Sequence, residues 1–137
     1  MPEKHRDLES ISKGFETILV VEDNDELREF MKTLLTESGY TVLTATDGEE
    51  GLAVFDAHPQ EISLVISDVV MPNLNGREFR NALEQKYPGR KFLFISGYTD
   101  SAVQRGFVLD DKIDFLQKPF SAFEFSDMVR NILDRSS

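Results

Sequence analysis

Short apolar runs alternate with amphipathic segments along the chain from about residue 16 onward. Ile18-Leu19-Val20-Val21 is the clearest run, and four consecutive apolar residues, three of them β-branched, are typical of a strand buried on both faces. Similar runs predict four more strands, at Thr41–Leu43, Ile62–Ile66, Phe92–Ile95 and Phe115–Leu116. Strands that alternate with helices favour a parallel α/β sheet covered on both faces.

Helical periodicity separates these runs. One apolar face, formed by Leu27, Phe30, Met31, Leu34 and Leu35, predicts the first helix. Asn24 or Asp25 is expected to cap its start, and Gly39 to follow its end. The patterns Asp47 with Glu50 and Ser121 with Glu124 predict capping boxes for two more helices. A further helix is expected after Asn75-Gly76, and a weak one at Thr99–Leu109.

Composition places this pattern in a single acidic domain. The chain has 137 residues, with 15 Lys and Arg against 25 Asp and Glu, a net charge of −10. Residues 1–14 have no period and balance three acids with three bases, so we expect a linker at 1–14 and the domain at 15–137. The negative surplus argues against nucleic acid and against anionic membrane surfaces.

No apolar run approaches the roughly 18 residues of a membrane span, and no cysteine is present. The absence of cysteine excludes disulfides and thiolate chemistry. We therefore expect a cytoplasmic domain without direct membrane contact.

Polar side chains stand where the predicted strands end. Glu22 and Asp23 follow the first strand, Asp68 the third, Ser96 the fourth and Lys118 the fifth. Ligands of open α/β sheets bind at the carboxyl ends of the strands, so these side chains are candidates for one site.

Three carboxylates that cluster at one site either have raised pKa values or share a cation. Two unit charges about 4 Å apart repel by roughly 4 kcal/mol at an effective dielectric constant near 20. Because no His or Cys is close in sequence, the ligands are all oxygen, which favours Mg²⁺ (or Mn²⁺). An oxygen-only site beside a lysine suits phosphoryl chemistry, in which a carboxylate can act as the nucleophile.

Four motifs resemble the response-regulator receiver domain of two-component signalling, over about residues 16–135. They are Val21-Glu22-Asp23-Asn24, Ser67-Asp68-Val69-Val70-Met71-Pro72, Ser96-Gly97 and Lys118-Pro119-Phe120. The resemblance implies a flavodoxin-like α/β fold, a doubly wound five-stranded parallel sheet in the order 2-1-3-4-5. It also implies a phosphorelay function, in which a phosphohistidine supplies the phosphoryl group and the domain switches conformation.

The family's site residues carry over position by position. Asp68 matches the phosphoacceptor. The resemblance implies that Asp23, Asp68 and the backbone carbonyl of Val70 bind Mg²⁺, while Glu22 acts mainly through a metal-bound water. Glu22 replaces the commoner Asp at its position.

The remaining matches concern the phosphoryl group and the switch. Ser96 matches the hydroxyl that bonds the phosphoryl group. Lys118, followed by a proline that is cis in this family, matches the lysine that pairs with a phosphoryl oxygen. Phe115 matches the aromatic switch position and, lacking a hydroxyl, would act through packing alone.

The resemblance also implies partners. The strings Glu16–Asp23 and Ser96–Asp100 are similar to C-terminal receivers of hybrid sensor histidine kinases, although the chain's length fits a stand-alone receiver equally well. Expected partners are a histidine kinase or a histidine phosphotransfer domain, and a protein that docks on the face of the fourth helix, fifth strand and fifth helix. The isolated domain would be a self-phosphorylating acceptor rather than an enzyme.

Two alternatives remain open. A small Mg²⁺-dependent phosphohydrolase would also use an aspartyl phosphate, but no acid lies two residues after Asp68. A receiver-like interaction module working without phosphorylation is disfavoured because every acid, hydroxyl and lysine position is filled. A nucleotide-binding module has the least support, since no glycine-rich loop follows the first strand.

Overall fold

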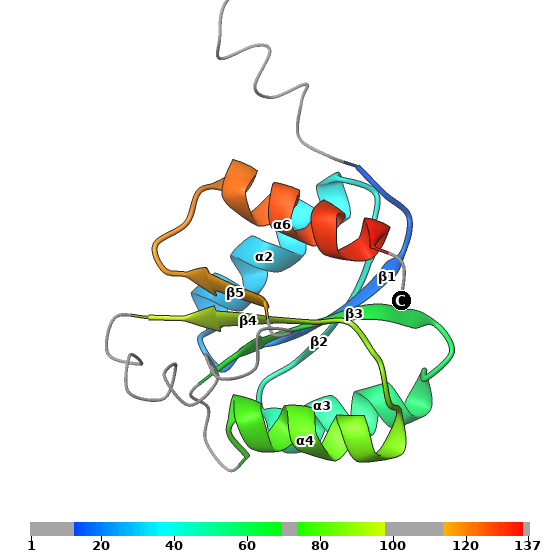
Figure 1. Cartoon of the computed structure of the whole chain (residues 1–137). Coiled ribbons are helices and arrows are strands. Elements are labelled where there is room, and N and C mark those ends of the chain that lie inside the picture. Colours follow the sequence, from blue (N-terminus) through cyan, green and yellow to red (C-terminus); the bar gives the residue numbers. More distant parts are fainter. Residues whose placement is uncertain (1–12, 70–73, 98–113, 136–137) are drawn as a thin grey trace, which may run out of the picture.

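The computed structural model describes residues 13–69, 74–97 and 114–135, which form a parallel sheet with helices on both faces (Figure 1). Its strands are β1 (Thr17–Val21), β2 (Thr41–Ala45), β3 (Ile62–Asp68), β4 (Phe92–Ser96) and β5 (Asp114–Gln117). They lie in the order β2-β1-β3-β4-β5, and every neighbouring pair is parallel. The predicted doubly wound sheet of order 2-1-3-4-5 is confirmed.

Among the described residues, the helices that cover the sheet are α2 (Asp25–Glu37), α3 (Gly48–Ala57), α4 (Gly76–Lys86) and α6 (Ala122–Asp134). Figure 1 shows α2 and α6 on one face and α3 and α4 on the other. The weak helix expected at Thr99–Leu109 lies outside the described residues.

The interior strand β1 faces both helical layers. Ile18 and Val20 are fully buried in the core beneath α2 and α6, while Leu19 and Val21 are fully buried in the core beneath α3 and α4. Side chains alternate between the two faces of a strand, so a strand covered on both faces needs an uninterrupted apolar run. This explains why β1 was visible in the sequence.

The N-terminal caps of the helices agree only in part with the predicted ones. Asn24, rather than Asp25, caps α2 by accepting a hydrogen bond from the Leu27 N–H. The Asp47 side chain caps α3, but Glu50 bonds Thr46 instead of completing the predicted capping box. The box at Ser121 and Glu124 is confirmed.

The predicted burial of Phe30 is wrong. The sequence pattern put it on the buried face of the first helix, yet it is 43% exposed, with its ring centroid 6.4 Å from that of Phe120. Met31 and Leu35 occupy the buried centre of the α2 face. Because one residue turns a helix by about 100°, the position before Met31 falls on the flank.

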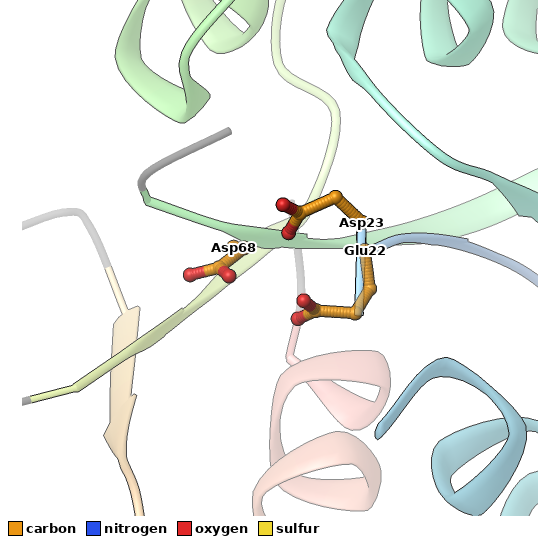
Figure 2. A group of neighbouring side chains, drawn as sticks. All are labelled: Glu22, Asp23 and Asp68. Atoms are coloured by element: carbon orange, nitrogen blue, oxygen red, sulfur yellow. The ribbon is translucent and has the colours of Figure 1, made fainter. Parts of the chain in front are cut away.

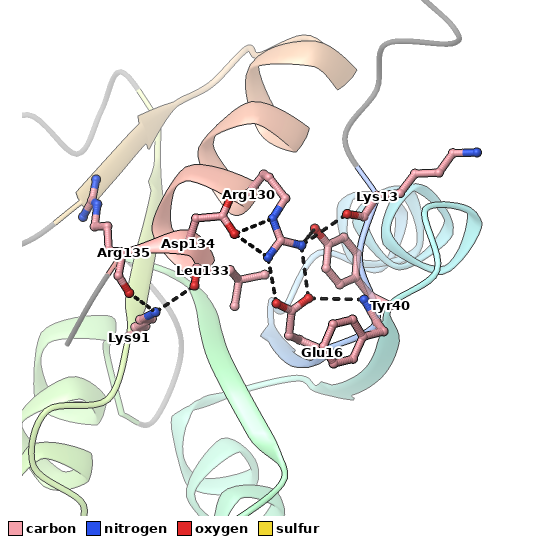
Figure 3. Close-up of polar contacts among 9 residues, drawn as sticks. Lys13, Glu16, Tyr40, Lys91, Arg130, Leu133, Asp134 and Arg135 are labelled. Carbon is pink, nitrogen blue, oxygen red and sulfur yellow. Dashed lines mark hydrogen bonds and ion pairs between the residues drawn. The ribbon is translucent and has the colours of Figure 1, made fainter.

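Arg130 of α6 bonds the segment that leads into β1 (Figure 3). These contacts lie at the end of the sheet opposite the carboxyl ends of the strands. The Arg130 guanidinium donates to both carboxylate oxygens of Glu16, at 3.1 and 2.7 Å, and to the Tyr40 hydroxyl and the Lys13 carbonyl. A side chain on Gly14 would collide with Arg130 and Tyr40. The Arg130 contacts hold residues 13–16 against α6.

Within the described ranges, no helix has the length and apolar character needed to cross a membrane.

Candidate functional site

The sheet brings Glu22, Asp23 and Asp68 together at its carboxyl edge. Asp68 is the last residue of β3, and Glu22 directly follows β1, which pairs with β3 through Val21 opposite Ser67. One oxygen from each carboxylate lies within 4.8 Å of the others. Figure 2 shows the Glu22 and Asp23 side chains extending from the end of β1 with their carboxylates on the side of Asp68.

Two of these carboxylates are deeply buried. Glu22 is fully buried and Asp68 is 6% exposed, while Asp23 is exposed. Oε2 of Glu22 accepts a hydrogen bond from the Asn24 N–H at 3.1 Å. Within the part of the chain that the structure describes, Glu22 Oε1 and Asp68 Oδ1 are buried without a hydrogen-bond partner. Leaving a buried acceptor unsatisfied is costly, so a group that satisfies both oxygens would stabilise the site.

Burial also changes how these acids titrate. Burial, reinforced by the charge of Asp68, raises the pKa of Glu22 to about 8. Burial raises the pKa of Asp68 as well, and the positive charge of Lys118 opposes that rise. Both shifts come mainly from burial, which disfavours the charged form of each carboxyl.

A hard divalent cation fits this donor set. The three converging groups are all carboxylates, and two of their oxygens are buried with no hydrogen-bond partner among the described residues. Carboxylate oxygen is the ligand type that Mg²⁺ takes, usually from one or two side chains. Val70, whose carbonyl is the third ligand that the resemblance implies, lies outside the described residues.

Lys118 approaches the cluster from the end of β5. Its Nζ lies 3.5 Å from Asp68 Oδ2, at the long limit of a hydrogen bond, and its side chain remains 33% exposed. The Lys118–Pro119 peptide bond is cis, and the Lys118 N–H donates to the Ser96 carbonyl at 2.7 Å. The expected ammonium is therefore beside the expected acceptor.

Ser96 and Phe115 complete the predicted set. Ser96 is buried at the end of β4, one residue beyond Ile95, which pairs with Asp68 across the sheet. Phe115 lies half-buried in β5, and its ring stacks on Phe94 with centroids 5.7 Å apart. The strand order thus places the hydroxyl beside β3 and the aromatic residue one strand further out.

Sequence reasoning missed two residues that shape the site. The Arg28 guanidinium donates to the Glu22 carbonyl, and Gly76 packs so tightly on the Asp68 carbonyl that a Cβ there would collide with it. The helix expected after Asn75-Gly76 is α4, and Asn75 caps it in a capping box with Glu78 that the sequence analysis did not predict. The spacing Asn75-x-x-Glu78 was the available signal.

Comparison with known proteins agrees with this geometry. The sequence model of the response regulator receiver domain matches residues 18–130. Sensor kinase CckA of Brucella abortus (strain 2308) is 38% identical over 122 residues, which cover 89% of this chain and 13% of that protein. The chain also spans about half the length of the transcriptional regulators that it matches.

Solved structures give the same result. The crystal structure of a response regulator receiver domain protein from Clostridium thermocellum has a TM-score of 0.80 and 28% identity, covering 88% of this chain and 96% of that one. The receiver domain from the hybrid histidine kinase CckA has a TM-score of 0.72 and 30% identity, covering 86% and 99%. In sequence and in fold, the chain belongs to the response regulator receiver domain family.

Proposed function

We propose that Asp68 accepts a phosphoryl group from a phosphohistidine, with Mg²⁺ or Mn²⁺ held by the neighbouring carboxylates. The observation that carries the proposal is the convergence of Glu22, Asp23 and Asp68 within 4.8 Å, with Lys118 Nζ 3.5 Å from Asp68. Family membership supports it, because receiver domains are phosphoacceptor signalling domains that bind Mg²⁺ in an acidic pocket. They interact with histidine kinases and phosphotransfer proteins.

The transfer itself is a displacement at phosphorus. An oxygen of the Asp68 carboxylate forms a bond to phosphorus, the bond from phosphorus to the histidine nitrogen breaks, and the nitrogen keeps the electron pair. The product is an acyl phosphate on Asp68 and a neutral histidine on the donor. A bound Mg²⁺ supplies charge neutralisation to the phosphoryl oxygens.

Each protein group has a separate part in this step. Asp23 and Asp68, with the Val70 carbonyl, would hold the cation, and Glu22 would act mainly through a metal-bound water. Lys118 balances the charge that the phosphoryl oxygens bring. Its remaining exposure leaves room for the incoming group.

Ser96 and Phe115 would respond to phosphorylation of Asp68. The Ser96 hydroxyl hydrogen-bonds the new phosphoryl group at the neighbouring strand end, and Phe115 repacks against Phe94 in response. The domain shifts its population toward an active conformation by this route. As an isolated domain it is a self-phosphorylating acceptor rather than a multiple-turnover enzyme.

The wider setting belongs to the same proposal. Residues 1–14 form a linker and residues 15–137 the receiver domain, within a cytoplasmic protein such as a hybrid histidine kinase. The similarity to CckA supports this setting. The downstream protein partner docks on the face that includes β5 and α6, and nucleic acid is not a partner.

Phosphoramidate tests the proposal, because its phosphorus–nitrogen bond reproduces that of phosphohistidine. The protein is incubated with phosphoramidate and Mg²⁺, and its intact mass is measured. We expect the mass of one added phosphoryl group in the wild type and none in Asp68→Asn. Equal phosphorylation of the two proteins would contradict the proposal.

A further inference from the structure

Arg28 contacts the acidic loop from the side of α2. Its Nη1 donates to the backbone carbonyl of Glu22 at 2.8 Å, and its Nη2 pairs with the carboxylate of Asp25. The Arg28 side chain is 15% exposed, whereas that of Asp25 is 85% exposed. The guanidinium is therefore packed beneath the loop, with the exposed Asp25 holding its outer edge.

The carbonyl that Arg28 holds belongs to the peptide joining Glu22 to Asp23. Holding that peptide plane restricts how far the backbone of Glu22 and Asp23 can turn their side chains away from the pocket. The Asn24 N–H holds Glu22 Oε2 at 3.1 Å from the other side of the loop. Two hydrogen bonds thus orient the buried carboxylate, and the one from Arg28 occupies no carboxylate oxygen.

This arrangement matters because ionised carboxylates in this pocket repel one another. Like charges about 4 Å apart repel by roughly 4 kcal/mol at an effective dielectric constant near 20. When all three carboxylates are ionised, as cation binding requires, Glu22, Asp23 and Asp68 would move apart if their backbones could move. A contact to the carbonyl resists that separation and occupies neither Glu22 Oε1 nor Asp68 Oδ1, which have no hydrogen-bond partner in the described part of the chain.

We propose that Arg28 is a positioning residue that preorganises the acidic loop for the divalent cation by holding the Glu22 carbonyl. The inference rests on the proposed function, since it concerns the same pocket. The guanidinium suits this role because its planar fork can bond a carbonyl and a carboxylate together, which a lysine ammonium cannot do in the same geometry.

A positioning role and a simple charge effect predict opposite changes in Mg²⁺ affinity when Arg28 is removed. A positive charge close to the pocket repels a divalent cation, so removing it should tighten Mg²⁺ binding if Arg28 acts only through its charge. If Arg28 positions the loop, removing it should weaken binding. Partners that hold metal ligands in place typically contribute about tenfold or more to metal affinity.

The experiment compares Arg28→Gln, Arg28→Lys and the control Lys32→Met. Lys32 is exposed one helical turn further along α2, so the control removes a charge from the same helix without touching the loop. Mg²⁺ affinity is measured from the rise in Tm with Mg²⁺ concentration and from the Asn24 amide shift in ¹⁵N spectra. Both readouts are independent of phosphorylation.

We expect both Arg28 variants to bind Mg²⁺ about tenfold more weakly, and to shift the metal-free Asn24 amide resonance. Lys32→Met should bind Mg²⁺ as tightly as the wild type or more tightly. Unchanged or tighter binding by Arg28→Gln would overturn the inference. If Arg28→Gln does not fold, Arg28→Lys decides, because it keeps the charge and loses only the fork.

The outcomes also separate this inference from the proposed function. A wild type that binds Mg²⁺ but gains no phosphoryl group would contradict the proposed function alone, while weaker Mg²⁺ binding by both Arg28 variants would still support the positioning role. Unchanged affinity in both variants, with normal phosphorylation of Asp68, would overturn the inference alone. A wild type that does not bind Mg²⁺ would overturn both.

Discussion

The Nζ atom of Lys118 lies 3.5 Å from Oδ2 of Asp68, although 50 positions separate the two residues in the sequence. The contact crosses from the end of β5 to the end of β3, with β4 between them. It lowers the pKa of Asp68 against the rise caused by burial. Lys118 therefore favours the ionised, nucleophilic form of the carboxyl.

Replacing Lys118 tests this contact. In Lys118→Gln we expect phosphorylation by phosphoramidate to slow by about 10²-fold, because the charge that stabilises the phosphoryl oxygens is lost. Lys86→Gln is the control, since Lys86 is exposed on α4 and pairs with Asp56. The initial rate is measured by intact mass. Equal rates in the two variants would show that Lys118 has no part in the transfer.

Glu22 predicts a pH dependence of stability in the metal-free protein. Its pKa rises from 4.5 to about 8 on folding. Below pH 4.5 the carboxyl is protonated in both states and has no effect. Between those values the unfolded chain releases a proton that the folded protein keeps, so the free energy of unfolding falls as the pH rises. Above pH 8 the full cost remains.

Glu22→Gln removes that cost. In a metal chelator, we expect the Tm of the variant to exceed that of the wild type increasingly as the pH rises from 4.5 to 8. Saturating Mg²⁺ should shrink or reverse the difference, because the cation stabilises the ionised pocket of the wild type. Thermal unfolding across this range is the measurement. A difference that does not vary with pH would count against the burial argument.

Gly76 and Gly48 form a matched pair at the first positions of α4 and α3. A Cβ on Gly76 would meet the Asp68 carbonyl, whereas a Cβ on Gly48 would meet the Leu74 carbonyl. We expect Gly76→Ala and Gly48→Ala each to destabilise the fold by roughly 1–3 kcal/mol in urea unfolding. Only Gly76→Ala should also weaken Mg²⁺ binding, because it displaces Asp68. Equal Mg²⁺ affinity in both variants would refute this link.

Arg130 predicts a stability effect that is independent of the site. Hydrogen bonds from Arg130 lower the pKa of Glu16, so the pair stabilises the fold above the ordinary Glu16 pKa of 4.5 and loses this effect as the pH falls. We expect Arg130→Met to cost roughly 1–3 kcal/mol near neutral pH, because Glu16 loses its partner. Urea unfolding at two pH values measures it. Weaker Mg²⁺ binding by this variant would contradict the claim that the Arg130 contacts act independently of the site at the opposite end of the sheet.

Much of the fold could be predicted because each buried strand appears in the sequence as a short run of apolar residues. β1 and β4 were visible as apolar runs, and the predicted strands fell short mainly at polar ends, as at Ser67 and Asp68 of β3. These two residues continue the ladder to β1 and β4, but their polarity breaks the apolar pattern. Strand ends that form a site are therefore the places where hydrophobic patterning stops early.

The site was predictable as far as topology determines it. Parallel strands place their carboxyl ends together, so Glu22, Asp23 and Asp68 had to meet once the strand order was known. The contacts of Arg28 and Gly76 with backbone carbonyls leave no periodic signal, because they depend on how α2 and α4 pack on the loops. Such supporting contacts became visible only in three dimensions.

The central claim is that Asp68 carries the phosphoryl group. The direct measurement is to phosphorylate the protein with phosphoramidate and Mg²⁺, reduce the acyl phosphate with borohydride, and map the modified residue by peptide mass spectrometry. We expect homoserine at position 68 in the Mg²⁺ sample and none in the chelator control. Modification at another residue, or at Asp68 regardless of Mg²⁺, would contradict the account.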